Sequence, residues 1–183
     1  MKQISSEEIF NTRRSRRSTA THGTNRTTAI TYPPCALGAP QLTPNTGNIA
    51  RSCAAFQLPL SLIEPLGFSI DDRAVKRAGL DYWPHVDLAT HPDFEHFLAE
   101  LPVPYRLIGC SRHQGQSLST FQFQPGDVLL FGREDTGLPN PVRERCDAIC
   151  TIPMRGHENV RSLNLSVSTA LVSFQAGLQL GLW

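Results

Sequence analysis

The chain has 183 residues, of which 40% are hydrophobic and 18% are charged, and its formal net charge is +1. This length suits one globular domain and is sufficient to bury a hydrophobic core. The sequence has no run of about 18 uncharged apolar residues, no collagen period and no repeat of about 20–50 residues, which excludes a membrane-spanning helix, a collagen-like fibre and a solenoid.

The first 40 residues differ from the rest of the chain in charge. They hold six basic and two acidic residues (net +4), whereas residues 41–183 hold eleven basic and fourteen acidic residues (net −3). Because residues 1–30 are rich in Ser, Thr, Arg and Asn without an apolar period, we interpret residues 1–40 as a disordered or atypical leader and residues 41–183 as the folded domain. A basic arm for nucleic acid and an organellar transit peptide are alternatives, although Glu7 and Glu8 argue against the second.

Several prolines lie where the leader meets the domain. Residues 31–44 contain Pro33, Pro34, Pro40 and Pro44. Proline lacks the backbone N–H that a central strand must donate to its neighbours. We therefore expect no regular central strand in residues 31–44.

Strands and helices are expected to alternate over the rest of the chain. Apolar runs predict strands at residues 60–63, 105–110, 128–131 and 146–152. Turn residues followed by apolar residues at helical spacing predict helices that start near residues 49, 72, 93 and 165. In the last helix, capped by Asn164 or Ser162, one stripe is apolar: Leu165, Leu171, Phe174 and Leu178. This alternation favours an α/β domain with a mainly parallel sheet flanked by helices.

The five cysteines are Cys35, Cys53, Cys110, Cys146 and Cys150. Their number is odd and no apolar signal segment precedes them, which favours reduced thiols in a cytosol-like compartment. Cys146 and Cys150, with His157 downstream, are spaced more widely than the ligands of a structural zinc site. We therefore expect buried thiols and no metal.

Three segments beside strand ends or helix starts could bind a ligand. Residues 45–51 place Arg51 about one turn inside a helix whose N-terminal amides favour an anion. Residues 131–139 follow an apolar strand, and Gly132 there allows close approach of the backbone. Residues 152–166 lead into the last helix, where Ser162 and Asn164 could hold a ligand or only cap the helix. Each segment alone also fits an ordinary turn or helix cap.

In this order and spacing, the segments resemble the SPOUT superfamily of knotted methyltransferases. Within it they resemble the TrmL-type tRNA 2′-O-methyltransferases, which modify the wobble nucleotide. The resemblance covers about residues 41–180. It rests on PNTGNIAR at 44–51, LIEPLGF at 62–68, RAGLDY at 77–82, FGREDTGLP at 131–139, IPM at 152–154 and SLNLS at 162–166.

The resemblance implies an α/β fold with a C-terminal trefoil knot and a homodimer in which each active site uses both chains. S-adenosylmethionine is the implied methyl donor, without a metal. The implied donor-binding residues are Cys110, Gly132, Ile152 and Ser162. The implied catalytic residues are Arg51, as general base or orienting group, with Asn48, Glu134 and Asn164.

We therefore expect 2′-O-methylation of the ribose at position 34 of tRNA by a cytoplasmic enzyme without membrane association. Methylation at another tRNA position or of ribosomal RNA, and a non-catalytic RNA-binding knot protein, are the alternatives. Residues 1–40 match nothing in the family. Phe174 stands where several relatives carry a Tyr thought to help tRNA binding, so that contact cannot be transferred.

Overall fold

The computed structural model describes residues 35–38, 40, 43–67, 82–155 and 162–183. These residues form a seven-stranded sheet in the order β3-β2-β1-β6-β4-β7-β5, and all neighbouring strands are parallel. The strands are β1 (Cys35–Gly38), β2 (Leu60–Ile63), β3 (Leu88–His91), β4 (Arg106–Cys110), β5 (Gln116–Ser117), β6 (Asp127–Phe131) and β7 (Ala148–Thr151). The predicted α/β class with a mainly parallel sheet is therefore confirmed.

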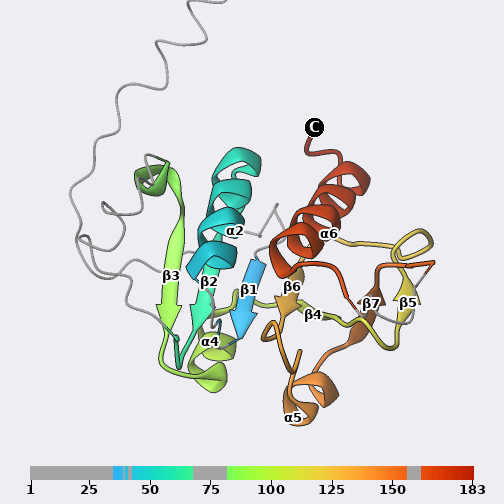
Figure 1. Cartoon of the computed structure of the whole chain (residues 1–183), viewed down its shortest axis with the longest axis horizontal. Coiled ribbons are helices and arrows are strands. Elements are labelled where there is room, and N and C mark those ends of the chain that lie inside the picture. Colours follow the sequence, from blue (N-terminus) through green and yellow to red (C-terminus); the bar gives the residue numbers. More distant parts are fainter. Residues whose placement is uncertain (1–34, 39, 41–42, 68–81, 156–161) are drawn as a thin grey trace, which may run out of the picture.

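Helices cover both faces of this sheet. They are α2 (Thr43–Phe56), α4 (Phe94–Glu100), α5 (Asn140–Glu144) and α6 (Leu165–Gln179), with a short 3₁₀ helix, η1 (Trp83–His85). Helices α2 and α6 lie side by side (Figure 1). The domain therefore has three layers, with helices packed on each side of the sheet. This is typical of parallel sheets, which are buried on both faces.

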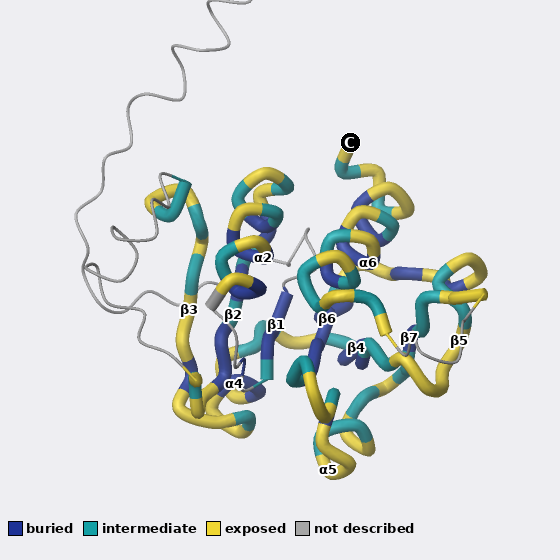
Figure 2. The backbone as a smooth tube through the Cα atoms, viewed as in Figure 1, coloured by how far each residue is buried: buried dark blue, intermediate teal, exposed yellow. Residues whose placement is uncertain are grey.

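The core is split between the two faces because side chains alternate along each strand. Leu37 and Phe131 pack with Ile49 of α2 and Val172 of α6 in one cluster. Ala36, Val128 and Leu130 pack with residues from the other face, including Phe97 of α4. Figure 2 shows β1 and β6 as buried strands at the middle of the molecule.

The prediction against a central strand in residues 31–44 is wrong. Strand β1 pairs with β2 on one side and with β6 on the other, and Cys35, Ala36 and Leu37 are fully buried. The four residues of β1 contain no proline. The prolines flank the strand without interrupting it, so each backbone N–H of the strand can donate. The sheet therefore begins within the segment assigned to the leader.

The other predicted strands are confirmed as β2, β4, β6 and β7, with small shifts of their ends. Helix α2 begins at Thr43, so the predicted cap residues 45–48 lie in its first turns. Asp93 caps α4 by accepting from the His96 amide at 2.8 Å, and Asn164 caps α6. The helix predicted near residue 72 and residues 1–34 lie outside the described residues.

The expected trefoil knot stays a prediction, because residues 156–161 on the path to α6 lie outside the described part. Within the ranges that the structure describes, no helix is both long enough and apolar enough to span a bilayer.

Candidate active site

The carboxyl ends of β4, β6 and β7 surround a cavity with the start of α6. Its empty volume is about 870 Å³, part of which is open solvent. All four residues predicted to bind the methyl donor, Cys110, Gly132, Ile152 and Ser162, line this cavity. Ligands of parallel sheets bind at this edge.

The wall formed by Gly132 depends on the absence of a side chain. A Cβ atom at this position would lie 2.1 Å from the carbonyl carbon of Gly137 and 2.2 Å from the nitrogen of Leu138. The loop returns this closely because Arg133 and Gly137 exchange backbone hydrogen bonds of 3.1 and 2.9 Å. Gly137 has a φ of +71°, a conformation that glycine adopts without strain. Backbone groups thus form this side of the cavity.

A side-chain network connects three segments that are far apart in sequence. Asn45 of α2 donates from Nδ2 to Glu134 Oε1 at 3.2 Å. Its Oδ1 accepts from Asn164 Nδ2 at 2.8 Å. Asn164 Oδ1 accepts from the amide of Ser166 at 2.8 Å, which caps α6. Glu134 also lines the cavity, so the network fixes one of its walls.

Asn45 is the central residue of this network, and the sequence pattern did not single it out. It is 6% exposed, in the first turns of α2, and it joins two of the predicted catalytic residues. Asn48 is exposed, and its side chain makes no hydrogen bond to another described residue; only its carbonyl accepts, from Ser52 Oγ at 3.1 Å. The sequence pattern holds no signal that separates Asn45 from Asn48, because residues three apart lie on the same side of a helix.

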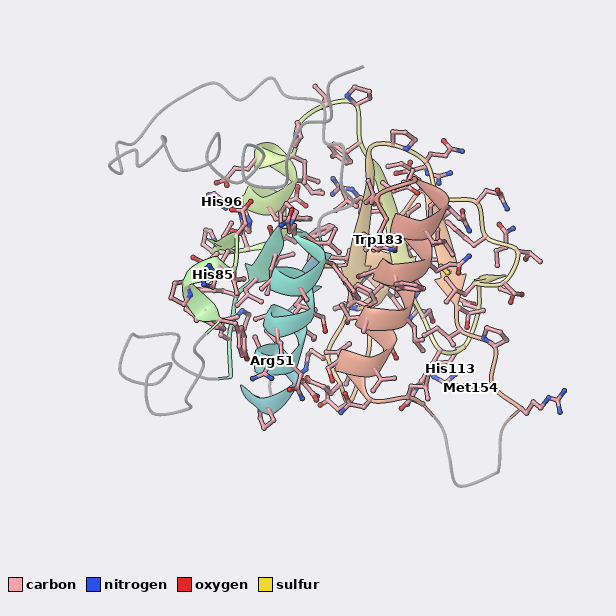
Figure 3. The ribbon with its side chains drawn as sticks, turned by 90° about the horizontal axis from the view of Figure 1, so that it is seen from above. Arg51, His85, His96, His113, Met154 and Trp183 are labelled. Carbon is pink, nitrogen blue, oxygen red and sulfur yellow. The ribbon has the colours of Figure 1, made fainter. Side chains whose placement is uncertain are left out.

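Arg51 lies on the exposed side of α2 and does not line the cavity. In Figure 3, α6 lies between Arg51 and the cavity residues His113 and Met154. The guanidinium carbon of Arg51 is 4.6 Å from the centre of the Tyr82 ring. The structure thus brings Glu134 and Asn164 together through Asn45, and leaves Asn48 and Arg51 outside that network.

The thiols around the cavity are uncharged at neutral pH. Burial raises the pKa of the Cys110 thiol well above its ordinary value and that of Cys150 to about 12. Burial also raises the pKa of Cys146, which packs against the other core cluster and does not line the cavity, to about 11. Only the thiolate form of cysteine is a nucleophile or a metal ligand. The neutral thiols therefore act as small apolar side chains. All five cysteines are free, and the described residues contain no group of three or more metal-ligating side chains.

The lining fits S-adenosylmethionine in chemical character. Phe131, Leu138 and Val172 supply apolar surface for a flat base, while Glu134 and Ser162 supply polar groups. The backbone wall at Gly132 leaves room for close contact with a ligand.

Comparisons with known proteins agree with this geometry. A model of the SpoU rRNA Methylase family matches residues 35–174. The tRNA (cytidine(34)-2′-O)-methyltransferase of Burkholderia ambifaria is 43% identical over 148 residues, which cover 79% of this chain and 94% of the relative. The protein of the same name from Aeromonas hydrophila is 43% identical over 147 residues, which cover 79% of this chain and 92% of the relative.

Solved structures share the fold. A structure described as giving insights into the 2-OH methylation of C/U34 on tRNA is 46% identical, with a TM-score of 0.74, and the match covers 80% of this chain and 95% of that one. The SpoU methyltransferase AviRb from Streptomyces viridochromogenes, in complex with AdoMet, is 23% identical, with a TM-score of 0.70 over 84% of this chain and 62% of its own. At that identity the likeness is one of fold.

Proposed function

Because the chain belongs to the SpoU rRNA methylase family, we propose that it transfers a methyl group from S-adenosylmethionine to the ribose 2′-oxygen at position 34 of tRNA. The observation that carries the proposal is the Asn45 network, which joins the loop after β6 to the start of α6 beside the cavity. The relatives named for methylation at cytidine 34 support tRNA as the substrate.

The residues around the cavity act by binding and orientation. S-adenosylmethionine supplies an activated methyl group when it is bound. Cys110, Gly132, Ile152 and Ser162 would hold it, since they line the cavity. Glu134 and Asn164, fixed through Asn45, keep the two loops in register, so that the ribose can be held in line with the methyl group.

Arg51 acts on the nucleotide. A 2′-hydroxyl is a weak acid, and negative charge develops on its oxygen as the proton leaves. Arginine remains protonated in proteins. Arg51 therefore orients the hydroxyl or stabilises the developing charge, and its exposed position on α2 leaves it accessible to RNA.

A homodimer is part of the proposal, and the outer face of α6 supports it. Leu171, Phe174 and Leu178 of the predicted apolar stripe are 44–52% exposed, whereas Val172 and Ala176 of the same helix face the core. Exposed residues follow the outward side of α6 in Figure 2. Trp183 extends this patch by stacking on Phe56 with ring centres 5.2 Å apart. A contiguous apolar patch of this kind marks a protein interface.

A shared site also accounts for the position of Arg51, which lies outside the cavity of its own chain. In a homodimer, groups from both chains can complete one site. The tRNA substrate and the five free thiols favour the cytoplasm as the compartment.

The test is methyl transfer in vitro to a defined tRNA. The protein is incubated with methyl-labelled S-adenosylmethionine and an unmodified tRNA transcript with C or U at position 34. The product is digested and the methylated ribose is located by mass spectrometry. We expect label on ribose 34 of the transcript. A matched transcript with a 2′-deoxyribose at position 34 should accept none. Label at another tRNA position or only on ribosomal RNA would contradict the assigned site, and no transfer to any RNA would contradict the enzymatic function.

A further inference from the structure

We propose that Tyr82 is a positioning residue, which holds the Arg51 guanidinium in the orientation used for methyl transfer. The inference rests on the proposed function, since it requires Arg51 to act on the nucleotide. It concerns a contact between α2 and the start of η1, which lie side by side. In Figure 3, the helix that carries the Arg51 label lies beside the short segment that carries the His85 label.

The contact is a cation over an aromatic face. The Arg51 guanidinium carbon lies 4.6 Å from the centre of the Tyr82 ring. This distance is within the range of about 6 Å in which a ring attracts a cation. The centre of the guanidinium thus lies over the ring, and its N–H groups can donate to a phosphate or ribose oxygen.

The Tyr82 ring is fixed to the helix that carries Arg51. Its hydroxyl donates to the carbonyl of Gly47 at 2.7 Å. Gly47 precedes Arg51 by four residues, so the two lie on the same side of α2, one turn apart. The phenol therefore binds α2 one turn before Arg51, and its ring covers the arginine.

Tyr82 is also held on the side of the core. It is partly buried and packs against the core cluster that includes Ile49. Its carbonyl accepts from the His85 amide at 2.9 Å, which closes η1. A residue held at its backbone, its ring and its hydroxyl is a firm support for a flexible side chain.

Arg51 has no competing ion pair within the described ranges. An exposed arginine has many rotamers, and ordering one of them costs conformational entropy. The contact with Tyr82 lowers that cost before RNA binds. Because the contact of Arg51 with the 2′-oxygen strengthens as negative charge develops in the transition state, placing this group in advance raises kcat more than affinity.

Two substitutions separate the ring from the hydroxyl. Tyr82→Leu removes the aromatic face, and we expect it to lower kcat about tenfold, with smaller changes in the KM for tRNA and in donor binding. Tyr82→Phe keeps the face and loses the hydrogen bond to Gly47, so it should retain at least about a third of the wild-type kcat. Tyr105→Leu is the matched control, since Tyr105 packs against the other core cluster. Its kcat should stay close to that of the wild type.

A double-mutant cycle distinguishes positioning from a general structural role. If Tyr82 acts through Arg51, Tyr82→Leu lowers kcat in the wild type but causes no further loss in an Arg51→Ala background. Independent, multiplicative losses in the two backgrounds would overturn the proposal. So would equal losses for Tyr82→Phe and Tyr82→Leu.

A nuclear magnetic resonance measurement keeps this inference separate from the proposed function. The Arg51 Nε–Hε signal should lie upfield in the wild type because of the ring current of Tyr82, and should move to its ordinary position in Tyr82→Leu. An unshifted wild-type signal would overturn the positioning role even in an active enzyme. A shifted signal in a protein that methylates no RNA would support the Tyr82 contact and contradict the proposed function instead.

Discussion

Substitutions of Arg51 distinguish a role of this residue in catalysis from a role in RNA binding alone. If it orients or stabilises the 2′-oxygen, Arg51→Ala should lower kcat on the order of 10²-fold or more, as for other positioned acid–base groups. Arg51→Lys keeps the charge but loses the planar guanidinium, and should also lower kcat strongly. Steady-state kinetics at saturating tRNA measure kcat. Calorimetry confirms that each variant still binds the methyl donor. Near-wild-type kcat for Arg51→Ala would refute the catalytic role.

Asn45 should matter more than Asn48, although both belong to the same sequence motif. Asn45→Ala leaves Glu134 and Asn164 without the side chain that joins them. A hydrogen bond of this kind contributes about 0.5–1.5 kcal/mol to stability, and two are lost, so we expect a lower melting temperature and weaker donor binding. Asn48→Ala is the matched control, because that side chain is exposed and outside the network. Equal effects of the two substitutions in thermal melts and calorimetry would contradict a structural role for the network.

The difference between these asparagines also shows what the sequence alone could predict at this scale. The residue types and spacing placed Glu134, Asn164, Gly132 and Ser162 in ligand-binding segments, and all but Asn164 line the cavity. The sequence could not identify the asparagine that faces inward. That depends on where α2 begins, and it begins at Thr43, before the expected cap residues.

Among the structural elements, the loop after β6 gives the sharpest test. Gly132→Ala places a Cβ atom 2.1 Å from the backbone of Gly137, so the loop must open and the cavity wall must move. We expect donor affinity to fall more than about tenfold, which corresponds to 1.4 kcal/mol.

Gly137→Ala is the matched control for this loop. Its Cβ atom would meet nothing within 4 Å, so the substitution carries only the strain of a φ of +71°. We expect reduced stability with a smaller loss of donor affinity. Isothermal titration with S-adenosylhomocysteine compares the ligand affinity of the two variants. A larger loss of affinity for Gly137→Ala than for Gly132→Ala would show that backbone conformation matters more than the close approach at Gly132.

The elements that the sequence predicted are those with long apolar runs. Strand β6, Asp127–Phe131, is buried along its whole length, and its hydrophobic run identified it as a parallel strand. Strand β1 was missed because four residues between prolines give little local signal, and its stability comes from pairing with β2 and β6. Strand β3 mixes polar and apolar residues, and β5 consists of two polar residues. Both lie at the edges of the sheet, where pairing on one side is enough.

At the scale of the whole molecule, the outer face of α6 predicts self-association. We expect the wild type to be a dimer at micromolar concentration, and Leu171→Glu to shift it to a monomer with much lower activity, because a charge would be buried in the interface. Val103→Glu is the matched control, since Val103 is 82% exposed and lies in the segment between α4 and β4, outside the apolar stripe of α6. Light scattering measures both variants. A monomeric wild type would contradict the dimer, and dissociation by Val103→Glu would contradict the assignment of the interface to α6.

The hydrogen bond between Asn45 and Asn164 joins residues that are 119 positions apart. A ribosome makes the amino-terminal partner early and the carboxy-terminal partner near the end of translation. Until α6 has been synthesised, the cavity beside Glu134 lacks one wall and Asn45 lacks its Asn164 partner. A nascent or prematurely terminated chain therefore cannot assemble the site, and the ability to modify RNA appears only when synthesis of the polypeptide is nearly complete.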